Sequence, residues 1–229
     1  MVSHERNISA ALSFVSGFMD TVGFIALFGL FTAHVTGNLV LAGGSLFSYN
    51  TVGSLIPKLV MLPVYIVGVA LSSYFINYKR ASLANLILAE VLFVSCFVIT
   101  GTTLLEHATR PTNAMISFTA SFAVTGMAIQ NTYMRKLLHD YAPNTVMTGN
   151  LTQASMNLAD IFTFFFLKDR RLHKDSTKPT FESLNKVATV LAGFLLGCFF
   201  GALLVKKVGL LCCLIPAMLL VWVWARIKV

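Results

Sequence analysis

Residues 33–43 read AHVTGNLVLAG, and residues 144–154 read NTVMTGNLTQA. The tripeptide Thr36-Gly37-Asn38 in the first stretch recurs as Thr148-Gly149-Asn150 in the second. The two copies lie 112 residues apart in a chain of 229 residues, so each half of the chain carries one. We therefore expect the chain to contain an internal repeat, with the two TGN tripeptides at equivalent points.

The composition predicts an all-α protein that crosses a membrane several times. Hydrophobic residues make up 56% of the chain, charged residues make up 11%, and the mean hydropathy is +0.77. A soluble domain carries roughly twice that share of charged residues. A helix needs about 20 mostly apolar residues to cross the hydrocarbon layer. Six runs are long enough, at residues 10–31, 59–78, 83–105, 113–133, 187–205 and 208–225.

Two further apolar stretches, residues 35–47 and 146–167, each begin at a TGN tripeptide. The first is short for a crossing, and the second is interrupted by Gln153, Asn157 and Asp160. The distribution of Lys and Arg tests whether they cross, because cytoplasmic loops carry the excess of these residues. Six crossings with the N-terminus inside leave 13 of the 17 basic residues in the cytoplasm, whereas eight crossings divide them 11 to 6. Six crossings are therefore favoured.

Six crossings predict a specific relation between the halves. Each half then has three crossings, so the second half enters the membrane from the opposite side. Repeat one covers about residues 9–110 and repeat two about 111–229, with a cytoplasmic linker at about 168–186. We expect two inverted three-helix repeats, each with an extra short helix that starts at TGN. Eight crossings would instead give parallel repeats.

The repeat extends beyond the tripeptide. Asp20-Thr21 aligns with Asn131-Thr132, and one inserted residue reconciles the spacing to each TGN. Small residues also recur at corresponding places, and we expect them to let helices pack closely; they are Gly68 and Ser72 in the first half, and Gly193, Gly197 and Gly201 in the second.

The stretch GFMDTVGFIALFGLFTAHVTGNLVLAG at residues 17–43, together with Gln130-Asn131 and the second TGN, resembles the YoaK-like family of bacterial integral membrane proteins. The resemblance covers essentially the whole chain. It implies a multi-pass protein of the bacterial inner membrane, and the family is one of unknown function. The chain departs from the family at Ala128-Ile129, where such proteins often carry Gly before Gln-Asn.

Three acidic residues lie within apolar stretches, namely Asp20, Glu90 and Asp160. A charged side chain at mid-bilayer costs about 2.5–3.5 kcal/mol on insertion scales, so such carboxyls face a protein interior or a water-filled cavity. Asp20 and Glu90 are candidates for proton or cation coupling, or alternatively for hydrogen bonds that only hold helices together. Asp160 is a weaker candidate near an interface, and His34 could titrate as a gate.

The TGN tripeptide has two readings. Thr is a good N-cap, and we expect a helix that begins at Gly37. A short helix that starts inside the membrane would direct free N–H groups towards a central site, as in many secondary transporters. The alternative is that TGN only caps ordinary helices at the surface. Gln130 and Asn131 lie in the fourth run, which is unusually polar. Together with the residues of both TGN tripeptides, they are candidates to line a pathway for a solute or ion.

Several functions are not expected. No basic stripe with interleaved aromatics indicates nucleic-acid binding. Cys96, Cys198, Cys212 and Cys213 lack the spacing of a metal site, and no cofactor or catalytic motif is recognisable. The leading hypothesis is a small secondary transporter or permease in the bilayer, as a homodimer, and not an enzyme. The alternative is a membrane scaffold or subunit that transports nothing.

Overall fold

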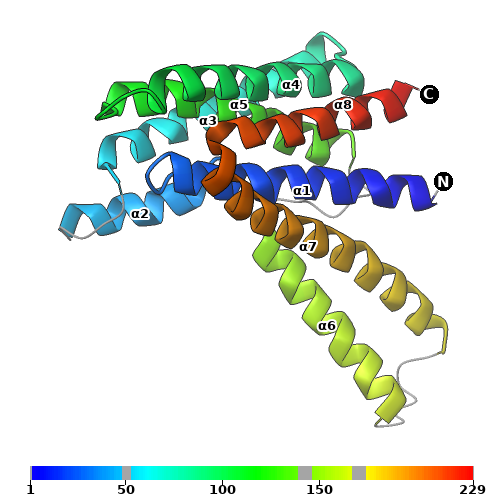
Figure 1. Ribbon diagram of the computed structural model, residues 1–229. Helices are drawn as coiled ribbons and strands as arrows, with labels where there is room; N and C mark the ends of the chain where they lie inside the picture. The colour runs from blue at the N-terminus through cyan, green and yellow to red at the C-terminus, as the bar shows by residue number, and fades with distance from the viewer. Residues whose placement is uncertain (1, 48–52, 139–145, 167–173, 229) are drawn as a thin grey trace.

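A computed structural model describes residues 2–47, 53–138, 146–166 and 174–228 of the chain. Within these residues the regular structure is helical throughout, as the sequence predicts (Figure 1). The helices of the first half are α1 (Val2–Ala26), α2 (Val35–Phe47), α3 (Leu55–Tyr78) and α4 (Leu83–Thr100), which continues into a π-helical turn η1 (Gly101–Leu105). Those of the second half are α5 (Asn113–Lys136), α6 (Met147–Phe166), α7 (Lys174–Val208), a 3₁₀ turn η2 (Gly209–Cys213) and α8 (Leu214–Lys228).

Four stretches of these helices are long and apolar enough to cross a membrane, at Arg6–Ala26, Leu55–Tyr78, Leu83–Leu105 and Lys178–Lys228. The last is 51 residues long and contains both α7 and α8. The run expected at 113–133 does form a helix, α5, but it is not among the four. Its many Ser, Thr, Gln and Asn side chains lower its hydropathy.

The first helix ends earlier than its apolar run predicts. We expect a run to residue 31, but α1 ends at Ala26. Phe28 and Gly29 then adopt positive φ angles of 56° and 81°, which a right-handed helix cannot contain. The chain therefore turns back before α2 although residues 27–31 are mostly apolar.

The region expected to be a linker, residues 168–186, is mostly helical. Residues 174–186 form the first turns of α7, with Pro179 inside the helix, and residues 168–173 lie outside the described part. The composition at Lys174 and beyond is polar, but polar residues form helices readily when one face packs against a neighbour. Here that neighbour is α6, which packs along α7.

Close packing of α1 against α7 dominates the centre of the bundle. A side chain on Gly193 would bring its Cβ within 2.6 Å of the Ala10 carbonyl oxygen, and Gly197 lies as tightly against Phe14. Gly201 lies against Phe18 in the same way. These glycines therefore allow backbone contact between α7 and α1.

A second, smaller contact joins α3 to α5. The Cβ of a residue at Gly68 would lie 2.9 Å from the Cβ of Ala128, and the Ser72 hydroxyl donates to the Gly68 carbonyl oxygen at 2.7 Å. The close approach at Ala128 is possible because the residue that faces it, Gly68, has no side chain.

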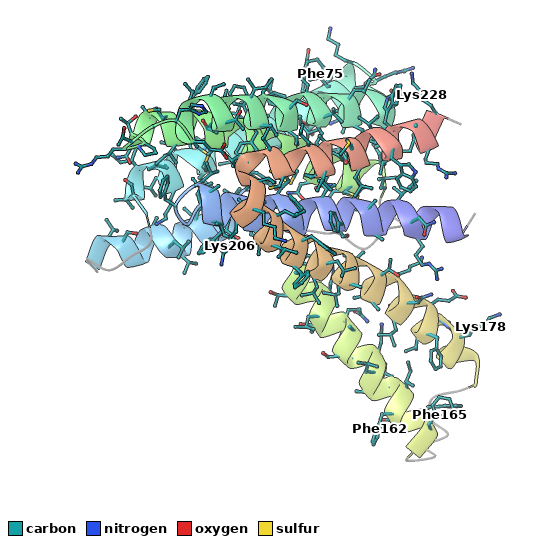
Figure 2. All side chains as sticks on the ribbon, viewed as in Figure 1. Phe75, Phe162, Phe165, Lys178, Lys206 and Lys228 are labelled. Carbon is teal, nitrogen blue, oxygen red and sulfur yellow. The ribbon has the colours of Figure 1, made fainter. Side chains whose placement is uncertain are left out.

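The outer faces of the helices carry many exposed apolar side chains (Figure 2). Phe75 on α3 and Phe162 and Phe165 on α6 are about half exposed, at 47%, 55% and 59%. In Figure 1, α6 and the N-terminal part of α7 extend away from the other helices, whereas the C-terminal part of α7 lies against α1. Large apolar side chains on the outside are what a surface in contact with lipid requires.

Candidate functional site

Asp20 on α1 holds the turn that leads from α1 to α2. Its Oδ1 accepts hydrogen bonds from the backbone N–H groups of Thr32, Ala33 and His34 at 2.9, 2.8 and 3.2 Å. Its Oδ2 lies 2.6 Å from Nδ1 of His34. Asp20 is buried, with 4% of its surface exposed, and both of its oxygens have partners. The carboxylate therefore satisfies backbone groups that the turn would otherwise leave unpaired.

His34 completes this arrangement. Its ring also meets the Phe194 ring of α7 edge-on, with centroids 5.5 Å apart. The hydrogen bond with Asp20 raises the pKa of His34 above its usual value, although burial acts in the opposite direction. Thr21, the neighbour of Asp20, lies beside Cys198 of α7. The Asp20–His34 pair thus fixes the turn where α1 and α7 are in contact.

Asn38 of the first TGN holds the same turn from the α2 side. Its Oδ1 accepts from the Phe31 N–H at 2.8 Å, and its Nδ2 donates to the Phe31 carbonyl oxygen at 2.8 Å. A Cβ at Gly37 would lie 2.9 Å from the Phe31 ring, so this glycine makes room for that ring. Thr36 is exposed. In this copy Asn38 and Gly37 contact Phe31 of the turn, whereas Thr36 is exposed.

The expected start of α2 at Gly37 is wrong by two residues. The helix begins at Val35, and the Gly37 N–H donates to the His34 carbonyl oxygen at 2.8 Å. Thr36 therefore lies inside the first turn and cannot be the N-cap. The helix starts earlier because Asp20 orders the backbone up to His34.

The second TGN lies at the start of α6. Thr148 and Gly149 are exposed, whereas Asn150 is buried. The Asn150 N–H donates to the Val146 carbonyl oxygen at 3.0 Å, and its Nδ2 lies 4.0 Å from the Met147 sulfur. The asparagine is thus the buried member of both copies. Asp160, further along α6, is exposed.

A second buried carboxyl, Glu90 of α4, has very different surroundings. It is fully buried, and its Oε2 accepts from the Tyr133 hydroxyl of α5 at 2.7 Å. Its Oε1 has no hydrogen-bond partner among the described residues. Buried polar atoms rarely lack a partner, so this oxygen is available to a proton, a water molecule or an ion.

Two amides of α5 connect this region to neighbouring helices. Gln130 Nε2 donates to the Leu12 carbonyl oxygen of α1 at 3.1 Å, and Asn131 Nδ2 donates to the Tyr65 hydroxyl of α3 at 2.9 Å. The oxygens of both amides have no partner within the described residues. Gln130 and Asn131 lie on α5 close in the chain to Tyr133, the tyrosine that binds Glu90. Asp20 belongs to a separate cluster at the α1–α2 turn.

Several buried hydroxyls also have no hydrogen-bond partner in the part of the chain that the structure describes. They lie mainly on α1 and α5 and are Ser13, Ser16, Thr32, Ser117 and Thr119. Sequence reasoning identified the polar character of α5 but missed Tyr65, Tyr133, Ser13 and Ser16. A tyrosine in an apolar run is a usable signal, because a buried phenol needs a hydrogen-bond partner.

No cluster of three or more His, Cys, Asp or Glu side chains that could hold a metal ion occurs among the described residues. Cys212 and Cys213 are buried at the end of η2, just before α8, and Cys96 and Cys198 are half-buried; all four thiols are free. The polar groups with unused hydrogen-bonding capacity are therefore a carboxyl, amides and hydroxyls, which bind protons, water and small polar solutes.

Known proteins identify the family. The profile of the family described as "Protein of unknown function (DUF1275)" matches residues 8–225. The "UPF0700 transmembrane protein YoaK" of Bacillus subtilis (strain 168) is 26% identical over 171 residues, which cover 74% of this chain and 72% of that protein. No solved structure matches the chain. The chain therefore belongs to the DUF1275 family and is a membrane protein similar to YoaK.

Proposed function

We propose that this protein is a small secondary transporter or permease, and that Glu90 carries the proton or cation to which transport is coupled. The observation that carries the proposal is the environment of Glu90, a fully buried carboxyl with one oxygen bound by Tyr133 and the other without a partner in the described residues. An ionisable group inside a membrane-spanning bundle is by default a functional candidate.

The surroundings of Glu90 favour a reversible protonation. Within the described residues Glu90 is hydrogen-bonded to a neutral phenol and forms no ion pair with a basic side chain. A carboxylate without a cation is costly there, so we infer that Glu90 holds a proton at rest. A change in the contact between α4 and α5 that admits water would release it.

Asp20 has a different role in this proposal. Three backbone N–H groups and His34 already occupy its oxygens. Releasing Asp20 for coupling would leave those groups unpaired at a cost of roughly 1–3 kcal/mol for each buried donor. We infer that Asp20 positions the turn before α2, and that Glu90 is the group that titrates during transport.

Helix contacts support two inverted halves. Suppose that α1–α4 correspond in order to α5–α8. The contact of α1 with α7 then has its counterpart in the contact of α5 with α3. The contact of α2 with α3 likewise has its counterpart in that of α6 with α7. The corresponding helices α4 and α8 pack antiparallel, since Glu106, just after η1, accepts from the Leu210 N–H at 2.6 Å at the entrance to α8. Antiparallel counterparts are expected of inverted repeats and not of parallel ones.

The charges at the helix ends support an orientation. Arg135 and Lys136 lie in the last turn of α5, and Arg226 and Lys228 lie in the last turn of α8. On α8, Arg226 contacts the ring of Trp222 and Lys228 contacts the ring of Trp224. Tryptophan with Lys or Arg is typical of the membrane interface on the cytoplasmic side. We propose that both termini lie in the cytoplasm of a bacterial cell, that the protein spans the inner membrane, and that it forms a homodimer.

Solute-dependent proton movement tests the proposal. The purified full chain is reconstituted in liposomes that contain a pH-sensitive dye, and organic acids, amino acids and sugars are added one class at a time. We expect at least one class to move protons in the wild type. Glu90→Gln should abolish that movement, whereas Asp160→Asn, which changes an exposed carboxyl on α6 in the same way, should leave it unchanged.

The outcome also separates the rival function. Asp20 uses its hydrogen bonds to hold a turn in place and has no oxygen left for transport. Polar residues with only this structural role are expected of a membrane scaffold, so a non-transporting subunit is the second candidate. Equal proton movement in wild type and Glu90→Gln would remove Glu90 from the mechanism. Absence of movement with every solute class would favour the scaffold.

A further inference from the structure

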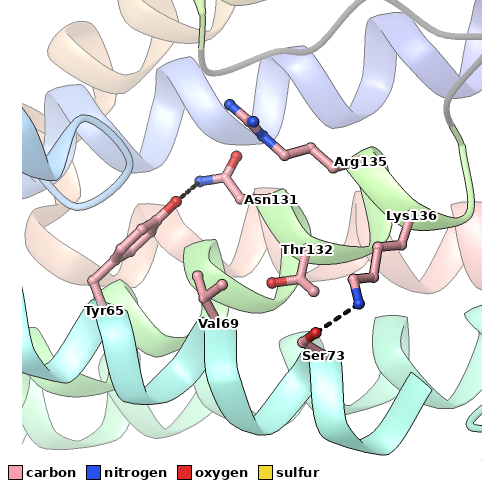
Figure 3. Close-up of a pocket in the computed structure, with 7 residues that line it drawn as sticks. All are labelled: Tyr65, Val69, Ser73, Asn131, Thr132, Arg135 and Lys136. Carbon is pink, nitrogen blue, oxygen red and sulfur yellow. Dashed lines mark hydrogen bonds between the residues drawn. The ribbon is translucent and has the colours of Figure 1, made fainter. Parts of the chain in front are cut away.

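A pocket of about 340 Å³ lies between α3 and α5, and Glu90 is not among the residues that line it (Figure 3). It is lined by Tyr65, Val69, Ser73, Asn131, Thr132, Arg135 and Lys136. Ligand pockets in proteins start at about 300 Å³, so this volume suits a small solute or a single headgroup. Among the described residues the lining contains two cationic side chains and no carboxylate, and this charge favours an anion.

The hydrogen-bond donors of the pocket are held in place. Lys136 Nζ donates to the Ser73 hydroxyl at 2.6 Å and to Asn77 Oδ1 at 3.0 Å, which leaves its third proton without an acceptor among the described residues. The Tyr65 oxygen accepts from Asn131 Nδ2, so the phenol proton has no acceptor among the described residues and can donate to a ligand. Both side chains are fixed before any ligand arrives.

Arg135 supplies the main positive charge. Figure 3 shows its guanidinium above Asn131, on the side of the pocket towards the Tyr65 hydroxyl. It forms no ion pair within the described residues. Asn131, which is 4% exposed, forms part of the pocket wall and orients Tyr65. A guanidinium presents several N–H donors in a plane, which matches the oxygens of a carboxylate or phosphate.

We propose that this pocket binds an oxyanion, a carboxylate or a phosphate group, through Arg135, Lys136 and the Tyr65 hydroxyl, with Val69 and the Tyr65 ring against the carbon atoms attached to it. The oxyanion belongs either to a free solute or to the headgroup of an anionic lipid. The inference concerns binding alone, so it holds whether or not Glu90 couples transport.

Binding is tested with the full-length chain in nanodiscs of phosphatidylcholine, which carry no net charge. Three probes are titrated separately at constant ionic strength, namely inorganic phosphate, succinate and phosphatidylglycerol, and the thermal midpoint of the protein is followed. We expect at least one probe to raise the midpoint in a saturable way. Phosphatidylglycerol alone would identify a lipid headgroup, whereas phosphate or succinate alone would identify a free solute.

Variants localise the effect. Arg135→Gln should weaken the apparent affinity about tenfold or more, as loss of a charge-assisted hydrogen bond predicts. Tyr65→Phe removes one hydroxyl and should weaken it about threefold, which provides a second test if Arg135→Gln does not fold. Lys79→Gln makes the same change of charge on an exposed residue outside the pocket, and should change the affinity less than about twofold.

Three results would overturn the proposal. The first is that none of the three probes raises the midpoint of the wild type. The second is that Lys79→Gln weakens binding as much as Arg135→Gln, because the anion would then respond to the general surface charge and not to this pocket. The third is unchanged affinity in both Arg135→Gln and Tyr65→Phe.

Discussion

The two buried carboxyls of this protein, Asp20 and Glu90, differ in how completely they are bonded. Asp20 accepts from three backbone N–H groups and pairs with His34. Glu90 is equally buried but has one partner, the Tyr133 hydroxyl, and one oxygen without any in the described residues. Burial alone therefore does not identify a group that exchanges protons. A fully bonded carboxylate stabilises the fold, whereas an incompletely bonded one has a free oxygen that can take up or release a proton without breaking a network of hydrogen bonds.

The largest effect on stability is expected from Asp20→Ala. The variant leaves a buried turn and His34 without their acceptor, and removal of one partner from a buried ionic pair costs about 3–5 kcal/mol. Thermal unfolding in detergent, with reversible unfolding where it can be reached, measures the loss. Asp160→Ala removes an exposed carboxyl and should be neutral. Equal stability of Asp20→Ala and wild type would contradict the role of Asp20 in holding the turn.

A smaller loss is expected from Asn38→Ala, which removes both hydrogen bonds to the Phe31 backbone. Loss of these bonds to a part-buried backbone should cost about 1–3 kcal/mol. The matched control is Asn185→Ala, at an exposed position on α7. Thermal midpoints measured side by side decide the matter, and a loss no larger than that of the control would mean that TGN does not hold the turn.

The third effect depends on pH. Because the pKa of His34 is raised in the folded protein, its ion pair with Asp20 contributes fully below the usual histidine pKa of about 6.5 and is lost as pH rises through the raised value. The wild type should therefore lose a little stability as the pH increases above about 6.5. His34→Gln should be less stable at low pH and should lack this dependence. A parallel pH profile in the two proteins would argue against the charged pair.

The smallest effect on stability is expected from Glu90→Gln. The amide oxygen can still accept from Tyr133, and an uncharged side chain suits the buried site. The free energy of unfolding should therefore fall by about 1 kcal/mol or less, and the thermal midpoint should change little. Loss of solute-dependent proton movement without loss of stability is the signature expected of a coupling group. A destabilisation as large as that of Asp20→Ala would instead indicate a structural role.

The sequence predicts the helices better than it predicts the contacts. Apolar runs mark α3, α4 and α5 to within a few residues, and the apolar stretch at 35–47 coincides with α2, although the N-cap interpretation of Thr36 places the helix start two residues too late. The early end of α1 could not be predicted, because residues 27–31 are mostly apolar and the turn depends on positive φ at Phe28 and Gly29.

The sequence identifies the candidate residues Asp20 and Glu90, but it does not predict which groups form hydrogen bonds with them. An acidic residue in an apolar run identifies Asp20 and Glu90 equally well, and their difference lies in which groups the fold brings to them. The partners of Asp20 are backbone N–H groups of a turn 12 to 14 residues away, and the partner of Glu90 is a tyrosine 43 residues away on another helix. Residue type alone does not encode such contacts, and the N-cap predicted at Thr36 was wrong for the same reason.

The central claim is that Glu90 exchanges a proton and Asp20 does not. Infrared difference spectra of the full-length protein in lipid, recorded between acid and alkaline pH, detect the carbonyl stretch of a protonated carboxyl inside the protein. We predict a band from a buried carboxyl in the wild type that is absent in Glu90→Gln and retained in Asp20→Asn. A band that persists in Glu90→Gln, or one that disappears in Asp20→Asn instead, would contradict the account.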